Sequence, residues 1–159
     1  MKEFWDERYA EKDWAYGKEP NVFLKEHIHH LKTGKALFPA EGEGRNAVYT
    51  SGLGWEVSAF DISVSGRKKA LQLADERNVR IDYQVSDLIS MEYPENYFDL
   101  LVLIFVHFPP QFRMKYHKSL LQFLKPGGKV ILEGFSKKHL TFSSKNPKAG
   151  GPPNIDMLF

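Results

Sequence analysis

Short apolar runs alternate with amphipathic stretches along most of this chain, which is typical of strands alternating with helices. Two runs are short and bounded by turns, at Ala36–Phe38 and Val57–Phe60. A third, Asp99–Val106, is apolar almost throughout and predicts a central strand that is buried on both faces. Residues 79–85 alternate strictly between apolar and polar side chains, which predicts a half-exposed strand, and residues 129–135 predict a fifth.

Four helices are predicted, one before the first strand and three between strands. Glu19–Leu31 carries an apolar stripe, with Pro20 in its first turn. Arg45–Ser51 follows the first strand, and Ser63 is a suitable N-cap for a helix that runs to about Arg77. The last helix is predicted from Gln111 to Leu124, and turns are predicted at residues 93–96 and 125–128.

Five strands alternating with helices predict a single α/β domain over residues 1–159, with three layers and a mainly parallel, doubly wound, Rossmann-like sheet. Ligands of such sheets bind beyond the carboxyl ends of the strands. The glycine turn at residues 40–44, Asp61, Asp87 and His107 all follow predicted strands. We therefore expect these residues to meet at one edge of the sheet.

The segment from Gly34 to Ser63 has the order strand, glycine turn, helix, strand, acid, which is typical of a nucleotide-binding βαβ unit. A dinucleotide site favours a third glycine at position 47, which is absent here, and the turn carries Glu41 and Glu43, which would repel a pyrophosphate. A sulfonium nucleoside has no phosphate. The spacing therefore favours a methyl donor over a nicotinamide or flavin, and a nicotinamide-dependent oxidoreductase stays as the less favoured hypothesis.

Charge and composition narrow the function classes further. The formal net charge is +2, from 22 basic and 20 acidic residues, which gives no electrostatic case for nucleic acid or a membrane surface. The chain has no cysteine, so thiol catalysis and cysteine-ligated zinc are excluded. His27, His29 and His30 do not point one way on a helix, and we expect no metal site. The charged N-terminus is unlike a signal peptide, which predicts a cytoplasmic protein.

Two terminal segments differ from the rest of the chain. Residues 1–18 are rich in aromatic and charged side chains, and they fit either an N-terminal arm packed on the domain or a lid over a ligand site. Trp5 and Tyr9 are spaced to share one helix face. Residues 136–159 are basic and loop-like.

Seven blocks in order make the sequence similar to a known family. They are YGKEPNVFL (16–24), AEGEGRNAVY (40–49), VSAFDIS (57–63), SDL (86–88), FDLLVLIFVHFPPQFR (98–113), LKPGG (124–128) and ILEGF (131–135). The chain resembles the class I S-adenosylmethionine-dependent methyltransferases, and within them the small bacterial branch similar to tellurite-resistance and thiopurine methyltransferases. The resemblance implies methyl transfer from S-adenosylmethionine to a small-molecule acceptor.

The resemblance also implies roles for matching positions. The implied donor-binding residues are Tyr16, Ala40, Gly42, Gly44, Arg45, Asp61, Ile62, Asp87, Leu88 and Phe105. The turn would hold the methionine portion, Asp61 the ribose hydroxyls, and Asp87 the adenine amino group. His107 would line the methyl-transfer pocket and is the candidate base for an oxygen or amine acceptor. Structural alternatives stay open: Asp61 as a helix cap, Asp87 as a turn residue, and His107 as a loop residue.

Two departures from the family affect the functional hypothesis. Phe38, Pro39 and Ala40 stand where the family has an acid and an opening glycine. The sequence also stops at Phe159, before the antiparallel strand pair that normally completes the sheet. Either the sequence is a fragment, or the exposed fifth strand is covered by a homodimer. The alternative function is a truncated or degenerate methyltransferase domain that binds the nucleoside or a partner without catalysis.

Overall fold

A computed structural model describes residues 2–136, 138 and 139, and these form five parallel strands and five helices. The strands are β1 (Lys35–Pro39), β2 (Glu56–Asp61), β3 (Asp82–Val85), β4 (Phe98–Ile104) and β5 (Leu124–Glu133). The helices are α1 (Lys2–Ala10), α2 (Val22–Ile28), α3 (Arg45–Gly52), α4 (Val64–Glu76) and α5 (Pro110–Leu121). The predicted three-layer fold with a parallel sheet is confirmed.

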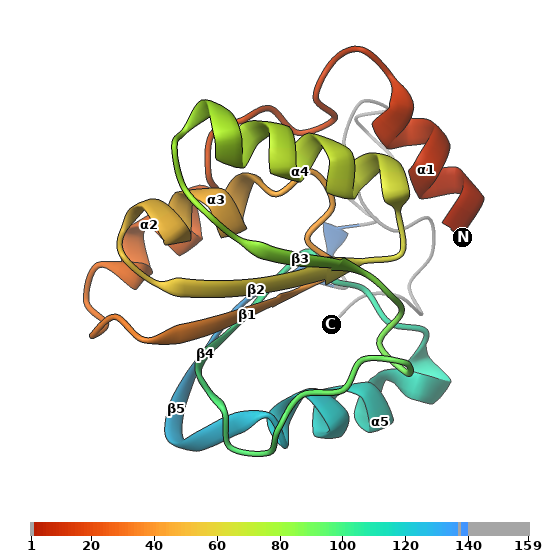
Figure 1. The fold of residues 1–159 in the computed structure, drawn as a ribbon. Helices are drawn as coiled ribbons and strands as arrows, with labels where there is room; N and C mark the ends of the chain where they lie inside the picture. The colour runs from red at the N-terminus through yellow and green to blue at the C-terminus, as the bar shows by residue number, and fades with distance from the viewer. Residues whose placement is uncertain (1, 137, 140–159) are drawn as a thin grey trace.

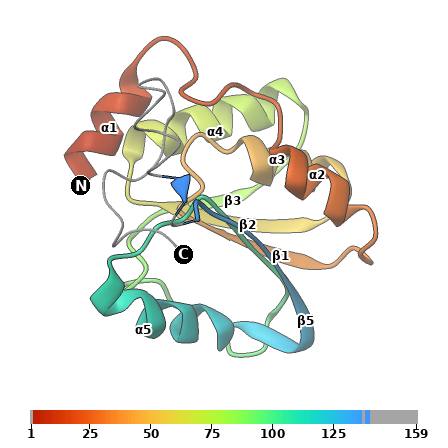
Figure 2. The same ribbon diagram turned by 180° about the vertical axis from the view of Figure 1, so that it is seen from behind.

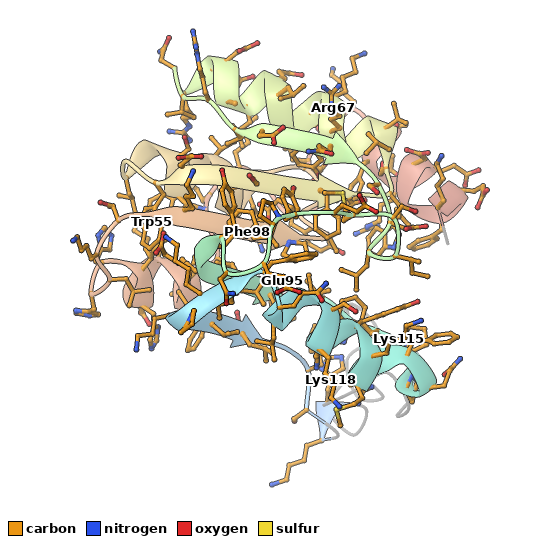
Figure 3. All side chains as sticks on the ribbon, turned by 60° about the horizontal axis from the view of Figure 1, so that its bottom comes forward. Trp55, Arg67, Glu95, Phe98, Lys115 and Lys118 are labelled. Atoms are coloured by element: carbon orange, nitrogen blue, oxygen red, sulfur yellow. The ribbon has the colours of Figure 1, made fainter. Side chains whose placement is uncertain are left out.

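The strand order is β3-β2-β1-β4-β5, so the order reverses between β1 and β4. Helices α1 to α4 lie on one side of the sheet and α5 lies on the other (Figure 1, and from behind in Figure 2). Figure 3 views the α5 side, where Lys115 and Lys118 mark that helix and Arg67 marks α4 beyond the sheet. Sheets of this kind bind ligands beyond the carboxyl ends of the strands, at such a reversal of strand order.

The core has one apolar layer on each face of the sheet because successive side chains of a strand point to opposite faces. In β1, Ala36 and Phe38 belong to the cluster that packs under α2 and α3, whereas Leu37 belongs to the cluster on the α5 side. In β4, Leu100 and Leu101 divide between the two clusters in the same way. The continuous apolar run of β4 is therefore explained by burial on both faces, as predicted.

Several predicted boundaries were wrong. The helix predicted from Glu19 begins at Val22, because Asn21 is the N-cap: its side chain accepts a hydrogen bond from Leu24 N at 2.9 Å. The turn predicted at residues 125–128 lies inside β5, as a bulge between the pairs Phe98–Leu124 and Leu100–Lys129. No helix connects β3 to β4, since residues 86–97 are irregular.

The helix cap at Ser63 is confirmed, and its hydroxyl accepts from Gly66 N at 3.0 Å. β3 is half-exposed as predicted, with Tyr83 buried, and it lies at the edge of the sheet. Most of the basic segment 136–159, and any antiparallel pair there, lie outside the described residues. In the part of the chain that the structure describes, no helix is long and apolar enough to cross a membrane.

The glycine turn is pressed against α4, which gives a first test. Gly44 and Gly54 both have a positive φ (82° and 90°), but a β-carbon on Gly44 would lie 2.5 Å from Ala70 Cβ, whereas one on Gly54 meets nothing within 4 Å. We expect Gly54→Ala to lower the free energy of unfolding by about 1–2 kcal/mol from backbone strain alone. Gly44→Ala should lose about 1–3 kcal/mol more from the clash.

Denaturant unfolding measures both variants, and Ala70→Gly in the Gly44→Ala background should recover part of the loss. Equal losses for the two single variants would show that the turn can move away from α4.

Candidate functional site

The turn after β1 begins with a strained residue. Ala40 has φ 51°, in the left-handed region that disfavours a residue with a β-carbon. Glu41 N donates to Phe60 O at 3.2 Å, which ties the turn to β2. Ala40 thus adopts a conformation that favours glycine, and the neighbouring strand holds the turn in place.

The two glutamates of the turn serve the protein itself. The Glu41 carboxylate accepts from Asn46 N and Ala47 N, each at 2.8 Å, and so caps α3. Glu43 is 5% exposed, forms a 2.7 Å ion pair with Lys69 and accepts from Ala15 N at 2.8 Å. From the sequence, both residues were considered only for their repulsion of a pyrophosphate, and these contacts were not predicted.

Asp61 lies at the tip of β2 and is 6% exposed. Its carboxylate accepts from Gly42 N at 3.0 Å with one oxygen and from Ser63 N at 2.9 Å with the other. Burial raises the pKa of Asp61 above its usual value. Each carboxylate oxygen has a second lone pair, so this side chain can also accept hydrogen bonds from a ligand.

Two tyrosines that were not among the expected site residues contact the same turn. Tyr83 donates its hydroxyl to Gly42 O at 2.6 Å. Tyr9 packs on the other side of Gly42, where a β-carbon would lie 2.6 Å from the Tyr9 hydroxyl oxygen. Burial, reinforced by the nearby Asp61 carboxylate, raises the pKa of both phenols. The period-two pattern of β3 placed Tyr83 inward, but nothing in the sequence related either ring to the turn.

The adenine-side residues are more open. Asp87 is exposed, and its carboxylate accepts from Ser90 N at 2.8 Å, a bond that lowers the pKa of Asp87. Ile62 and Leu88 are half-buried. Ser86 N donates to Asp61 O at 3.0 Å, so the ends of β2 and β3 are joined beside these residues.

The residues after β4 form an aromatic group. Phe105 has φ 54°, an outlier for a bulky side chain, and its N–H donates to Glu133 O at 2.8 Å. The Phe135 ring lies 4.7 Å from Phe105 and stacks on His107 at 5.5 Å, centroid to centroid. Strained backbone of this kind often marks a functional position.

Tyr16 and Arg45, two of the implied donor-binding residues, lie together. Arg45 Nη1 donates to Tyr16 O at 3.1 Å, and its guanidinium lies 5.8 Å from the centre of the Tyr16 ring. The structure thus brings the turn into contact with Asp61 and Tyr16 into contact with Arg45. The predicted residues after β2, β3 and β4 share the carboxyl edge of the sheet, because all five strands are parallel.

The sequence matches the methyltransferase domain family over residues 39–128. The chain belongs to this family. The match begins at the last residue of β1 and ends within β5, so it includes the glycine turn, Asp61, Asp87 and the segment after β4.

Among curated proteins, the domain is similar to phosphoethanolamine N-methyltransferase of Triticum aestivum, with 28% identity over 81 residues. That alignment covers 51% of this chain and 16% of the relative. Phosphoethanolamine N-methyltransferase 1 of Arabidopsis thaliana is also 28% identical, over 93 residues and 18% of its length. The chain therefore spans less than a fifth of the curated relatives it matches.

Solved structures give the same fold. The PH0226 protein of Pyrococcus horikoshii is 27% identical with a TM-score of 0.69, over 77% of this chain and 56% of that one. A protein solved in work on thioacetal formation in echinomycin biosynthesis has a TM-score of 0.77 at 21% identity, over 97% of this chain and 72% of that one. Phosphoethanolamine N-methyltransferase 1 of Haemonchus contortus, solved with phosphoethanolamine and S-adenosylhomocysteine, has a TM-score of 0.71 at 16% identity, over 99% of this chain and 34% of that one.

The buried carboxyl group of Glu41 gives a pH-dependence test. Burial raises its pKa from 4.5 to about 7, so the folded protein holds this proton more tightly than the unfolded chain. Its stabilising contribution is full below pH 4.5 and is lost as the pH rises through 7. Gln resembles the protonated acid, so Glu41→Gln should gain stability relative to wild type as the pH rises from 5 to 8.

Denaturant unfolding at several pH values measures this difference, with Glu92→Gln on an exposed loop as the control. If the difference in the free energy of unfolding between wild type and Glu41→Gln stays constant with pH, the raised pKa of Glu41 is contradicted.

Proposed function

We propose that this domain is an S-adenosylmethionine-dependent methyltransferase that acts on a small-molecule acceptor, within the single domain of residues 1–159. The observation that carries the proposal is the placement of Asp61. Its carboxylate sits at the tip of β2 and is held by the N–H of Gly42, whose turn follows β1, one of the two strands between which the order reverses. Membership of the methyltransferase domain family supports the same conclusion.

The described residues fit this donor in their chemistry. Asp61 can accept from two vicinal ribose hydroxyls while still accepting from Gly42 N and Ser63 N. The exposed carboxylate of Asp87 can accept from an adenine amino group, with Ile62 and Leu88 as apolar neighbours of the ring. Ala40, Gly42 and Gly44 would hold the methionine portion, near Tyr16 and Arg45. In this structure the space on Gly42 is taken by Tyr9.

Methyl transfer from a sulfonium needs few catalytic side chains. When bound, S-adenosylmethionine supplies a methyl group already activated by a sulfonium, and an acceptor displaces it in line. The protein positions the two reactants and excludes water. Phe105 and His107 would line the acceptor side. A thiolate acceptor needs no base, whereas an amine or hydroxyl acceptor would give its proton to His107.

The acceptor class is the finer part of the proposal. The seven sequence blocks favour the branch similar to tellurite-resistance and thiopurine methyltransferases, whose acceptors are small. The curated relatives are named for phosphoethanolamine, which adds an amine to the candidates. A panel of a thiol, tellurite, a thiopurine and phosphoethanolamine, assayed for methyl transfer, tests these choices together.

A second candidate function is a domain that binds the nucleoside without catalysis. The observation that favours it is the closed space on Gly42, where Tyr9 is 6% exposed. Binding of S-adenosylhomocysteine without methyl transfer to any acceptor of the panel would support this alternative.

Donor binding can be tested at Asp87 without disturbing the core. Asp87→Asn keeps an oxygen for Ser90 N but removes the charge and replaces one acceptor with a donor, so S-adenosylhomocysteine should bind about tenfold more weakly. Asp82→Asn, exposed near the other end of β3, is the matched control and should leave the affinity unchanged. Calorimetry with S-adenosylhomocysteine and NAD measures both variants.

No heat with S-adenosylhomocysteine for the wild-type protein would contradict the proposed function, and heat with NAD instead would favour an oxidoreductase. An unchanged affinity in Asp87→Asn would remove this residue from the site.

We also propose a homodimer through β5. This strand pairs with β4 on one side, no strand among residues 2–136 pairs with its other side, and Val130 and Leu132 are 43% and 40% exposed. Light scattering should give about twice the chain mass of 18.4 kDa at micromolar concentration. Val130→Lys should shift the protein toward monomer, and Ile89→Lys, at an exposed apolar residue elsewhere, should not.

A further inference from the structure

Helix α1 lies at the edge of the sheet where the strands end, on the side of α4 (Figures 1 and 2). It packs against α4, and Tyr9 is its one buried residue. The Trp5 and Tyr9 rings stack at 5.3 Å, as their spacing predicted. The N-terminal segment therefore covers the proposed donor site instead of extending away from it.

The Tyr9 ring fills a slot whose walls are two glycines. A β-carbon on Gly42 would lie 2.6 Å from the Tyr9 hydroxyl oxygen, and one on Gly66 would lie 3.1 Å from a carbon of the same ring. Gly42 is the centre of the turn that would hold the donor, and Gly66 is in the first turn of α4. The Tyr9 ring thus occupies the space that side chains on both glycines would fill.

Asp6 fixes α1 to the start of α4. One carboxylate oxygen accepts from Ser63 Oγ at 2.7 Å and from Ser65 N at 3.1 Å. These bonds, with the Ser63 hydroxyl first, lower the pKa of Asp6. Ser63 N also donates to Asp61 at 2.9 Å. One buried serine therefore joins the residue that holds α1 to the carboxylate proposed to bind the ribose.

Apart from Asp6 and Tyr9, Arg8 also contacts the chain outside α1, with its guanidinium 5.4 Å from the centre of the Tyr16 ring. A helix of nine residues is marginal without tertiary contacts, and seven of its members other than Tyr9 and Asp6 are exposed or half-buried. The chain is anchored again at Ala15, whose N–H donates to Glu43 at 2.8 Å. Residues 11–13 between these points are bends. Such a segment can open at a small free-energy cost while the rest of the fold stays intact.

We propose that α1 is a lid over the donor site: the Asp6 bonds hold it closed on α4 both in the free protein and over the bound nucleoside, and Tyr9 occupies the space on Gly42 until the nucleoside enters. This inference rests on the proposed function, because it supposes that the ligand of the turn is S-adenosylmethionine or its product. The donor would enter, and the product would leave, only when α1 moves off the turn. Opening of α1 would then limit both rates.

The test uses Asp6→Ala, with Glu7→Ala as the matched control on the same helix, since Glu7 is exposed and carries the same charge. Stopped-flow tryptophan fluorescence follows S-adenosylhomocysteine binding, with Trp5 on α1 as a reporter. Loss of the Asp6 bonds should raise the association and dissociation rate constants together, each by about tenfold, with a much smaller change in Kd. Glu7→Ala should behave as wild type.

Equal association and dissociation rate constants in Asp6→Ala and wild type would overturn the proposal that α1 is a lid. A second readout needs no ligand: amide hydrogen exchange of residues 4–10 should be faster in Asp6→Ala than in Glu7→Ala, and unchanged exchange would also overturn the role of Asp6. Failure of the proposed function would give a different result. In that case the wild-type protein would show no S-adenosylhomocysteine binding by calorimetry, and the rate of amide hydrogen exchange in α1 would not affect this conclusion.

Discussion

The hydrogen bond from Gly42 N to the Asp61 carboxylate is the constraint on which the site depends. It joins the turn after β1 to the tip of β2, two segments 19 residues apart in the sequence. Tyr83 holds the same turn through Gly42 O, and Ser63 N holds the other carboxylate oxygen. Five polar groups are thus buried together and satisfied, so the turn and the acid form one rigid unit.

The glycines of this unit have two separate reasons to lack a side chain. A β-carbon on Gly44 would strike Ala70, and one on Gly42 would strike Tyr9. Close approach of a ligand is the usual interpretation of such a turn. Here close approach by the protein itself already accounts for both positions, and the nucleoside would add to a surface that helix packing has shaped.

Backbone strain marks the two strands on either side of the order reversal. Ala40 follows β1 with φ 51°, and Phe105 follows β4 with φ 54°. A backbone hydrogen bond to a neighbouring strand fixes each position. Glu41 N, next to Ala40, donates to Phe60 O of β2, and Phe105 N donates to Glu133 O of β5. Strain of this kind persists only where the surrounding structure imposes it, and the strand ends at a switch point are such a place.

The sequence by itself determined the strands, the helix cap at Ser63 and the family, because apolar periodicity and short-range capping are local properties. It also placed Asp61 and Asp87 at strand ends. Only the tertiary structure decided the roles of Tyr9, Asp6, Glu41 and Glu43. Asp6 and Ser63 are 57 residues apart, and Tyr83 and Gly42 are 41 apart. No periodic pattern encodes such contacts, since they exist only after the strands and helices have packed.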